Sequence, residues 1–343
     1  MSLYNINTSN RTWWEAGSEI KKYVNKKITD NPEMDWIEYT LKKYYINKLP
    51  IESCLSLGCG RGQLERILAQ KRAFNHCDGY EDEGELEVYE AIKEAKANSF
   101  NNIDYHIVKM NSLRLPNNYY DSIWTNGVLN HLTNLEHVFS QTRKALKSDG
   151  LFIINEYVGP NCYQFSNHQK EIINLCLLLI PYKYRIINSE IEPSTNKRDH
   201  TSTRKIRWYT KRLVDKILDG DLIGVFRRRW NSCKAYVLHK DLIKTNINFP
   251  SVRDVMAFEP TLAIRSGDIY NLIEQNFHIL EKKDYGGSIF QFLLNGIIGN
   301  FKENDQTSEI IMQMLVMIED TLINLHEIQS NFSYIVASPK MQP

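Results

Sequence analysis

The 343-residue sequence lacks several features that would by themselves define a protein class. Its six cysteines stand at positions 54, 59, 77, 162, 176 and 233, and none forms a Cys-x-x-Cys pair. This spacing argues against a cysteine-based metal site and a disulfide framework, and it predicts a reducing, cytoplasmic compartment. With 42 Lys and Arg against 41 Asp and Glu, the net charge of +1 gives no general attraction to nucleic acid or a membrane surface.

The sequence also lacks a long hydrophobic run. The longest, residues 172–180, is interrupted by Asn174 and is too short to span a bilayer, so it predicts a buried helix that ends before Pro181. Residues 1–14 show no basic region followed by an apolar core, so we expect no secretory signal. The 42% of hydrophobic residues can instead build a large core in one or two domains.

The most informative stretch is residues 54–68. Residues 54–57 suit a buried parallel strand, and residues 63–68 have apolar side chains at helical spacing. Between them, Gly58, Gly60 and Gly62 allow a sharp turn and a close approach of the backbone to a ligand. The first N–H groups of the helix favour a polar or anionic group at the same place.

Two common nucleotide-binding loops fit this stretch poorly. A dinucleotide fingerprint wants a small residue where Gln63 stands, and no Gly-Lys-Ser/Thr triplet of a P-loop follows. The segment Leu57-Gly58-Cys59-Gly60-Arg61-Gly62 instead closely resembles the first motif of class I S-adenosylmethionine-dependent methyltransferases. The alternative is a glycine-rich turn in another kind of α/β protein.

Later segments resemble further motifs of that family in the same order. Residues 76–81 resemble its second strand, and the resemblance makes Glu81 the ribose ligand, with Asp82 and Glu83 as neighbours. A carboxylate can accept hydrogen bonds from both ribose hydroxyls. Alternatively, this acidic run only favours the start of the helix expected over 85–97.

The third motif departs from the family pattern. Residues 107–113 resemble the segment whose acid contacts the adenine amino group, but Lys109 stands at that place. We expect Asn111, or the backbone at Met110, to make this contact, with Ser112 beside them, because an amide oxygen can accept from an amine.

The fourth motif covers residues 120–132 and places Asn126 and Gly127 beside the methyl donor. A helix is expected over 135–146. Residues 147–154 then resemble the family's turn into strand five, with Ser148 where proline is usual.

Together these motifs imply an α/β fold: a Rossmann-like, seven-stranded, mostly parallel sheet with helices on both faces. They also imply S-adenosyl-L-methionine as cofactor. The predicted cofactor-binding residues are Gly58, Cys59, Gly60, Gly62, Glu81, Asp82, Met110, Asn111, Ser112, Asn126 and Gly127.

We expect four parts, including an N-terminal helical extension and large helical inserts after strands five and six. They are a helical lid (1–50), the cofactor-binding core (51–160), a mainly helical insert that caps the acceptor (161–265), and the end of the core with a helical insert (266–343). We expect the helices of the lid over 12–27 and 34–46. In the last part we expect a helix over 267–277, a strand over 278–285, a helix over 308–329 and a strand over 332–338. The lid aromatics Trp13, Trp14, Trp36 and Tyr39 either close over the donor or pack on the sheet.

A narrower resemblance concerns the reaction. Residues 57–65, 155–160, 263–266 and 285–287 resemble bacterial methyltransferases of polysaccharide and secondary-metabolite biosynthesis, which implies O-methylation of a sugar or similar small intermediate. A hydroxyl acceptor needs a base. The candidate catalytic residues are His131 and Glu156, with His168 as a third. Alternatively, His131 packs against the donor, and Glu156 hydrogen-bonds the acceptor or caps structure.

The evidence for the class of acceptor is the distribution of basic residues in the sequence. The basic residues between 197 and 230, rich in arginine, either bind an anionic small-molecule acceptor or form a solvated helix face. Arg265 either holds an acceptor anion or ties down a loop. Methylation of RNA or a peptide is an alternative, although residues 126–129 lack the aromatic-proline loop of many base methylases, and a non-catalytic donor-binding protein is another. The oligomeric state is not indicated.

Overall fold

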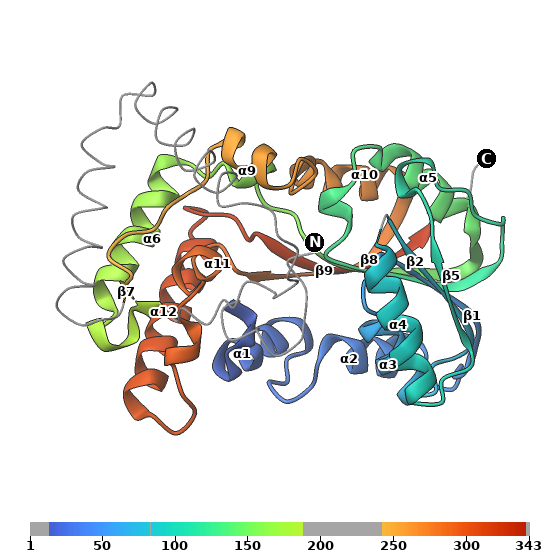
Figure 1. The fold of residues 1–343 in the computed structure, drawn as a ribbon, viewed down its shortest axis with the longest axis horizontal. Helices are drawn as coiled ribbons and strands as arrows, with labels where there is room; N and C mark the ends of the chain where they lie inside the picture. The colour runs from blue at the N-terminus through green and yellow to red at the C-terminus, as the bar shows by residue number, and fades with distance from the viewer. Residues whose placement is uncertain (1–13, 83, 188–241, 341–343) are drawn as a thin grey trace, which may run out of the picture.

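The computed structural model describes residues 14–82, 84–187 and 242–340, and its centre is a seven-stranded sheet (Figure 1). The strand order is β3-β2-β1-β4-β5-β9-β8. β9 runs antiparallel to both of its neighbours, and the other pairs are parallel. The strands are β1 (Ile51–Leu57), β2 (Phe74–Glu81), β3 (Ile103–Ile107), β4 (Tyr120–Asn126), β5 (Leu146–Tyr157), β8 (Phe277–Gly286) and β9 (Phe332–Pro339). The predicted mostly parallel, seven-stranded Rossmann-like sheet is confirmed.

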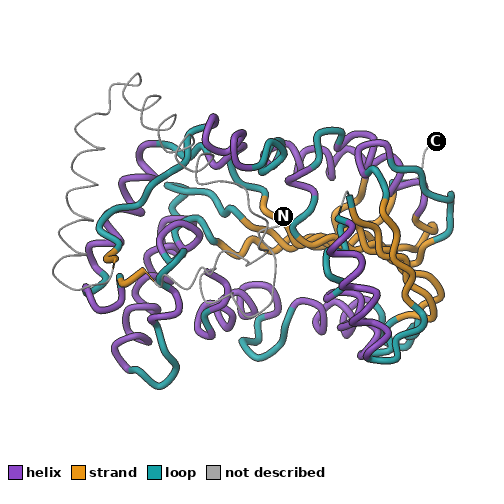
Figure 2. Tube along the Cα trace, viewed as in Figure 1, coloured by secondary structure: helices purple, strands orange, loops and turns teal. Residues whose placement is uncertain are grey.

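Helices cover both faces of this sheet, as predicted (Figure 2). Alternate residues of the central strands point into two separate hydrophobic cores, because successive side chains of a strand face opposite sides. On one face lie α2 (Trp36–Tyr44), α3 (Gln63–Gln70) and α4 (Glu85–Ala97), and on the other α5 (Leu135–Ala145) and α10 (Ile269–Asn276).

The N-terminal extension is helical, with α1 at Ser18–Thr29 followed by α2. The Trp36 ring lies 5.7 Å from that of Trp124 and 6.1 Å from that of Tyr334, between ring centroids. Trp14 is buried against Phe332. These aromatic side chains therefore pack on the sheet and its flanking helices, and Trp13 lies outside the described residues.

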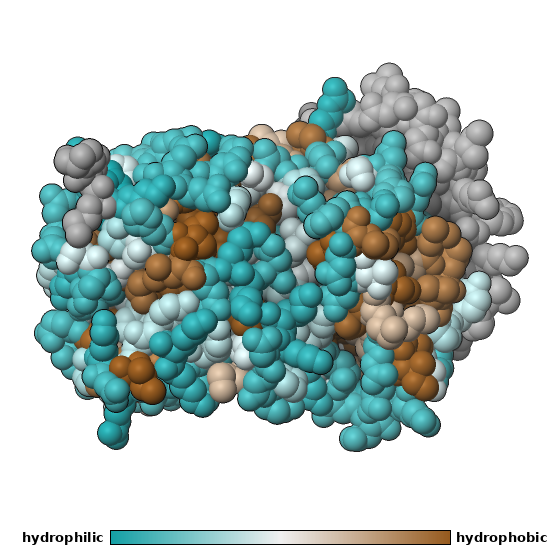
Figure 3. Space-filling model, turned by 180° about the vertical axis from the view of Figure 1, so that it is seen from behind, coloured by the Kyte–Doolittle hydropathy of each residue, from teal (hydrophilic) through white to brown (hydrophobic). Residues whose placement is uncertain are grey.

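The described part of the insert after β5 contains α6 (Asn167–Leu179) and α9 (Val252–Phe258), and a two-stranded sheet of β6 (Ile186–Ile187) and β7 (Leu242–Ile243) that the sequence did not predict. α6 ends before Pro181, as predicted. It is not wholly buried, however, because Leu175, Leu178 and Leu179 are about half exposed or more. Figure 3 shows apolar patches on the side of the molecule that carries α6 and α12 (Gln306–Asn324).

Between β8 and β9 lie the short α11 (Phe290–Leu293) and the long α12 (Gln306–Asn324). Among the helices that the structure describes, none combines the length and apolar character needed to cross a membrane. The basic cluster between residues 197 and 230 lies outside the described residues.

Candidate functional site

The glycine loop joins β1 to α3 at the carboxyl end of the parallel strands. The chain leaves β1 toward β2 on one side of the sheet and later returns to β4 on the other, so this point is the topological switch where such sheets bind ligands. The amides of Gly58 and Cys59 both donate to the carbonyl oxygen of Tyr80, at 2.7 and 2.9 Å. The loop is thereby held against the end of β2.

Each glycine of the loop has a positive φ, and their surroundings differ. A Cβ at Gly58 would lie 2.2 Å from Cγ2 of Val128, and one at Gly62 would lie 2.3 Å from the Tyr105 hydroxyl. At Gly60 a Cβ would meet no atom within 4 Å. The first and third glycines are thus required by packing, whereas the second faces open space, so its backbone is accessible.

Glu81 ends β2 beside this space. Its carboxylate accepts hydrogen bonds from the amide of Gly60 at 2.5 Å and from the amide of Asp82 at 3.1 Å. Burial raises the pKa of Glu81, and these two amides oppose the rise. Its oxygens therefore lie at the glycine loop, and Asp82 is next to it in sequence. Glu83 lies outside the described residues.

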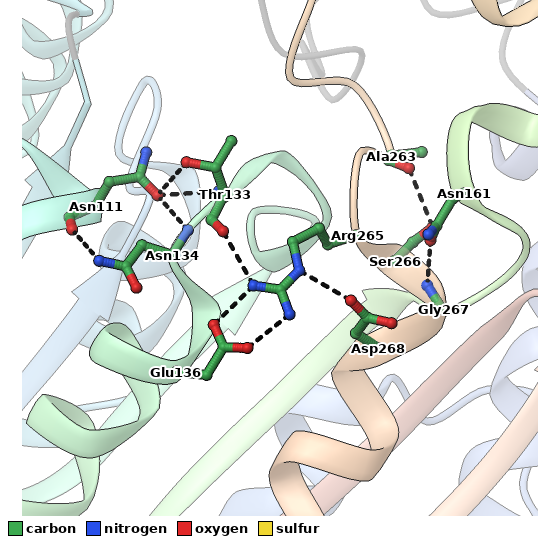
Figure 4. Close-up of polar contacts among 10 residues, drawn as sticks. All are labelled: Asn111, Thr133, Asn134, Glu136, Asn161, Ala263, Arg265, Ser266, Gly267 and Asp268. Carbon is green, nitrogen blue, oxygen red and sulfur yellow. Dashed lines mark hydrogen bonds and ion pairs between the residues drawn. The ribbon is translucent and has the colours of Figure 1, made fainter.

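The predicted adenine segment forms the 3-10 turn Met110–Ser112, in which Met110 is fully buried. The side-chain oxygen of Asn111 accepts from the amides of Thr133 and Asn134, at 2.9 and 2.8 Å, and from the Thr133 hydroxyl (Figure 4). Three donors already occupy the Asn111 oxygen and Met110 has no exposed surface, so the adenine contact of this segment stays a prediction. The Ser112 hydroxyl donates to the carbonyl of Lys109 at 3.3 Å.

Asn126 ends β4, and its side chain is the last of three that are joined by hydrogen bonds. The Tyr285 hydroxyl donates to Oδ1 of Asn155 at 2.7 Å, and Nδ2 of Asn155 donates to Oδ1 of Asn126 at 2.9 Å. The amide of Gly127 donates to the Asn155 carbonyl at 2.9 Å. This chain orients Asn126 so that its NH₂ group, a hydrogen-bond donor, points away from Asn155.

Glu156 lies beneath the loop that follows β4 and is fully buried. One oxygen accepts from the amides of Val128 and Leu129, at 2.8 and 2.7 Å. The other accepts from Nδ2 of Asn130 at 2.6 Å and from the amide of Tyr157 at 2.9 Å. With every acceptor position filled, this geometry fits the alternative in which Glu156 caps structure and gives no support to a base.

His131 ends the 3-10 turn Leu129–His131 and meets a residue of the insert. Its Nδ1 lies 2.8 Å from Oε1 of Glu259, and both side chains are largely buried. Burial would raise the pKa of Glu259, but the hydrogen bond and charge of His131 lower it below its usual value. Sequence reasoning missed Glu259, because no motif marks it within the insert.

Arg265 fastens the insert to the same loop region (Figure 4). Its guanidinium binds both oxygens of Glu136, each at 2.7 Å, and also reaches Asp268 and the Thr133 carbonyl. The hydrogen bond from Arg265 lowers the pKa of Glu136 to about 2. Of the two predicted roles, tying down a loop is the one that these contacts fit.

The backbone adds to this attachment. The amide of Ile264 donates to the carbonyl of Asn130 at 3.1 Å, next to His131. By contrast, His168 on α6 is more than half exposed and pairs with Glu327 at 3.2 Å. The structure thus brings His131 and Glu259 together beside the loop after β4 and leaves His168 at the surface.

One family model and several solved structures are similar to parts of this chain. A family model described as a methyltransferase domain matches residues 51–204. No curated protein sequence matches the chain. Among solved structures, an S-adenosylmethionine-dependent methyltransferase from Clostridium acetobutylicum is 20% identical, with a TM-score of 0.33 over 42% of this chain and 58% of that one.

A second solved structure aligns over nearly the whole chain. It is phosphoethanolamine N-methyltransferase 2 from Haemonchus contortus, in complex with phosphomonomethylethanolamine and S-adenosylhomocysteine. It is 11% identical, with a TM-score of 0.46 over 94% of this chain and 58% of that one. Residues 51–204 thus match a methyltransferase domain, the sheet is that of a Rossmann-like methyltransferase fold, and the cofactor is S-adenosylmethionine.

Proposed function

We propose that this protein transfers a methyl group from S-adenosylmethionine to a hydroxyl of a small biosynthetic intermediate such as a sugar. The observation that carries the proposal is the contact between His131 and Glu259 beside the loop after β4. The donor brings its own leaving group, so the protein must align the acceptor and remove the hydroxyl proton. A histidine whose Nδ1 proton is held by a carboxylate presents Nε2 as the base.

Other residues take supporting roles in this proposal. Glu81 binds the ribose, the 3-10 turn Met110–Ser112 lies beside the adenine, and the glycine loop holds the methionine part of the donor. Glu156 keeps the amides of Val128 and Leu129 in place and so fixes the turn that carries His131. Glu259 orients the imidazole and stabilises it when it takes up a proton.

The experiment is an acceptor panel of sugars and related hydroxyl compounds. It records formation of S-adenosylhomocysteine and the mass of one added methyl group. We expect turnover in His131→Ala to fall about 100-fold or more, since general base catalysis contributes on that order. Donor affinity, measured by calorimetry, should stay the same within about threefold, since the proposed role of His131 is toward the acceptor.

The control is His168→Ala, which removes an exposed histidine that pairs with Glu327 and should leave turnover unchanged. Normal turnover in His131→Ala would contradict the proposed base. Donor binding without turnover on any acceptor would favour a non-catalytic protein. Salt-dependent binding and methylation of RNA would favour a nucleic-acid substrate instead.

A further inference from the structure

Glu65 is a buried acid that the proposed reaction does not use. It stands in the first turn of α3, directly after Gly62, and its side chain is fully buried. Neither carboxylate oxygen has a hydrogen-bond partner among the described residues. An unpaired buried carboxyl group is costly, so its presence next to the ligand loop calls for a cause.

The polar and titratable groups that interact with Glu65 come from three strands, the glycine loop and α3 itself. They are Ser56 of β1, Cys59 of the loop, Cys77 and Glu81 of β2, Tyr105 of β3, and its neighbour Arg66. Arg66 is the one cation among them, and its guanidinium donates to the carbonyl of Arg61 at 2.6 Å.

Burial raises the pKa of Glu65 to about 7, although the Ser56 hydroxyl, the helix amide and Arg66 each lower it somewhat. A group with this pKa changes its protonation when a charge arrives nearby. Glu65 lies three residues after Gly62, where the loop enters α3. The charge of Glu81, whose carboxylate binds the Gly60 amide of the same loop, adds to the rise of this pKa.

We propose that Glu65 is the counter-charge of the donor site: it is neutral while the loop is empty and ionises when cationic S-adenosylmethionine binds there, releasing its proton to solvent. This inference rests on the proposed binding of the donor at the glycine loop. Methyl transfer converts the sulfonium of the donor into the neutral thioether of S-adenosylhomocysteine. Glu65 then loses the charge that favoured its ionised form, takes back a proton, and binds the product less tightly than the donor.

The experiment measures the affinities of S-adenosylmethionine and S-adenosylhomocysteine by calorimetry at about pH 6 and about pH 8. Both ligands carry the same ammonium and carboxylate, so their affinity ratio isolates the sulfonium charge. If the donor lowers the pKa of Glu65 by about one unit, the preference for the donor should rise roughly fivefold over this range. Titrations in two buffers of different ionisation enthalpy should also show proton release with the donor.

Two variants complete the test. Glu65→Gln has the shape of the protonated acid, so its affinity ratio should not change with pH. Glu319→Gln is the matched control, because Glu319 is another fully buried acid with a pKa raised to about 7, but its oxygens accept hydrogen bonds from the amides of Gly287 and Ile289, outside the glycine loop. It should keep the wild-type pH dependence.

The role of Glu65 would be overturned if the ratio of donor to product affinity in the wild type did not change with pH. It would also be overturned if the pH dependence of this ratio were still present in Glu65→Gln. The binding of the donor at the glycine loop is tested separately by Gly58→Val, whose side chain would collide with Val128. Donor binding that persists in this variant would overturn this binding site itself, and with it the inference.

Discussion

Two loops face each other at the carboxyl edge of the sheet, and each has a buried glutamate beneath it. The glycine loop and the loop after β4 meet where Gly58 lies against Val128. Glu156, under the loop after β4, accepts four hydrogen bonds. Glu65, under the glycine loop, accepts none among the described residues.

This difference indicates that the loop after β4 is fixed by its own hydrogen bonds, whereas the buried acid beside the glycine loop is not hydrogen-bonded within the described residues. A buried carboxylate with four donors holds its loop rigidly, as the turn that carries His131 requires. A buried carboxyl without donors gains little until a charged ligand arrives. The same residue type thus stabilises structure on one side and, in our proposal, responds to the cofactor on the other.

The most sensitive test of this comparison is to replace each of the two buried glutamates by glutamine. Glu156→Gln would turn an amide nitrogen toward at least one N–H donor and should cost about 3–5 kcal/mol of unfolding free energy. Glu65→Gln should change it by no more than about 1 kcal/mol near pH 6, because Gln resembles the protonated acid. Urea denaturation measures both values, and equal losses would contradict the comparison.

Next in size is the pH dependence of stability. The pKa values of Glu65 and Glu319 are raised by burial to about 7 from 4.5, so the folded protein keeps two protons that the unfolded chain has released. Their contribution is fully present below about pH 4.5 and is lost as the pH rises to about 7, at up to about 3 kcal/mol for each group. Glu65→Gln should remove its share of this slope. Denaturation midpoints that run parallel for variant and wild type would contradict the assignment.

The glycine loop offers a smaller but more specific test. Gly60→Leu places a side chain in the open space and should weaken donor binding about 100-fold, equivalent to about 2.7 kcal/mol. The positive φ of 51° at this position should lower stability by only about 1–2 kcal/mol. Calorimetry and thermal melting report the two effects. A folded variant with unchanged donor affinity would show that the ligand binds elsewhere.

The smallest effect is expected where the insert meets the core. Glu136 is exposed, so its ion pair with Arg265 is screened, and Glu136→Gln should cost under about 1 kcal/mol at neutral pH. Because the pKa of Glu136 is lowered to about 2, this contribution is present above pH 4.5 and is lost as the pH falls to about 2. A loss of several kcal/mol by urea denaturation at neutral pH would mean that the contact organises the whole loop.

The sequence predicted the donor side well because its signals are local. The first apolar run, the three glycines and the acid that ends β2 stand within thirty residues of one another, and each motif marks the end of a strand. The resulting sheet and the helices on both faces are confirmed. The roles of individual donor residues, including Glu81 and Met110, stay predictions.

The acceptor side could not be predicted in the same detail, because its contacts join distant parts of the chain. Arg265 and Glu136 are 129 positions apart, and Glu259 is similarly far from His131. Nothing in the sequence around Glu156 indicates that four donors fill its oxygens. The apolar run in α6 indicated burial, but hydrophobicity alone does not show which side of a helix meets the core, and three of its leucines are exposed.

The most direct test of the account is a crystal structure of the protein with S-adenosylhomocysteine bound. We predict the ligand between residues 58–62 and 126–131, with its ribose hydroxyls on Glu81 and its sulfur near Gly127. A ligand bound elsewhere, with the space at Gly60 unfilled, would contradict the central claim that the glycine loop holds the methyl donor.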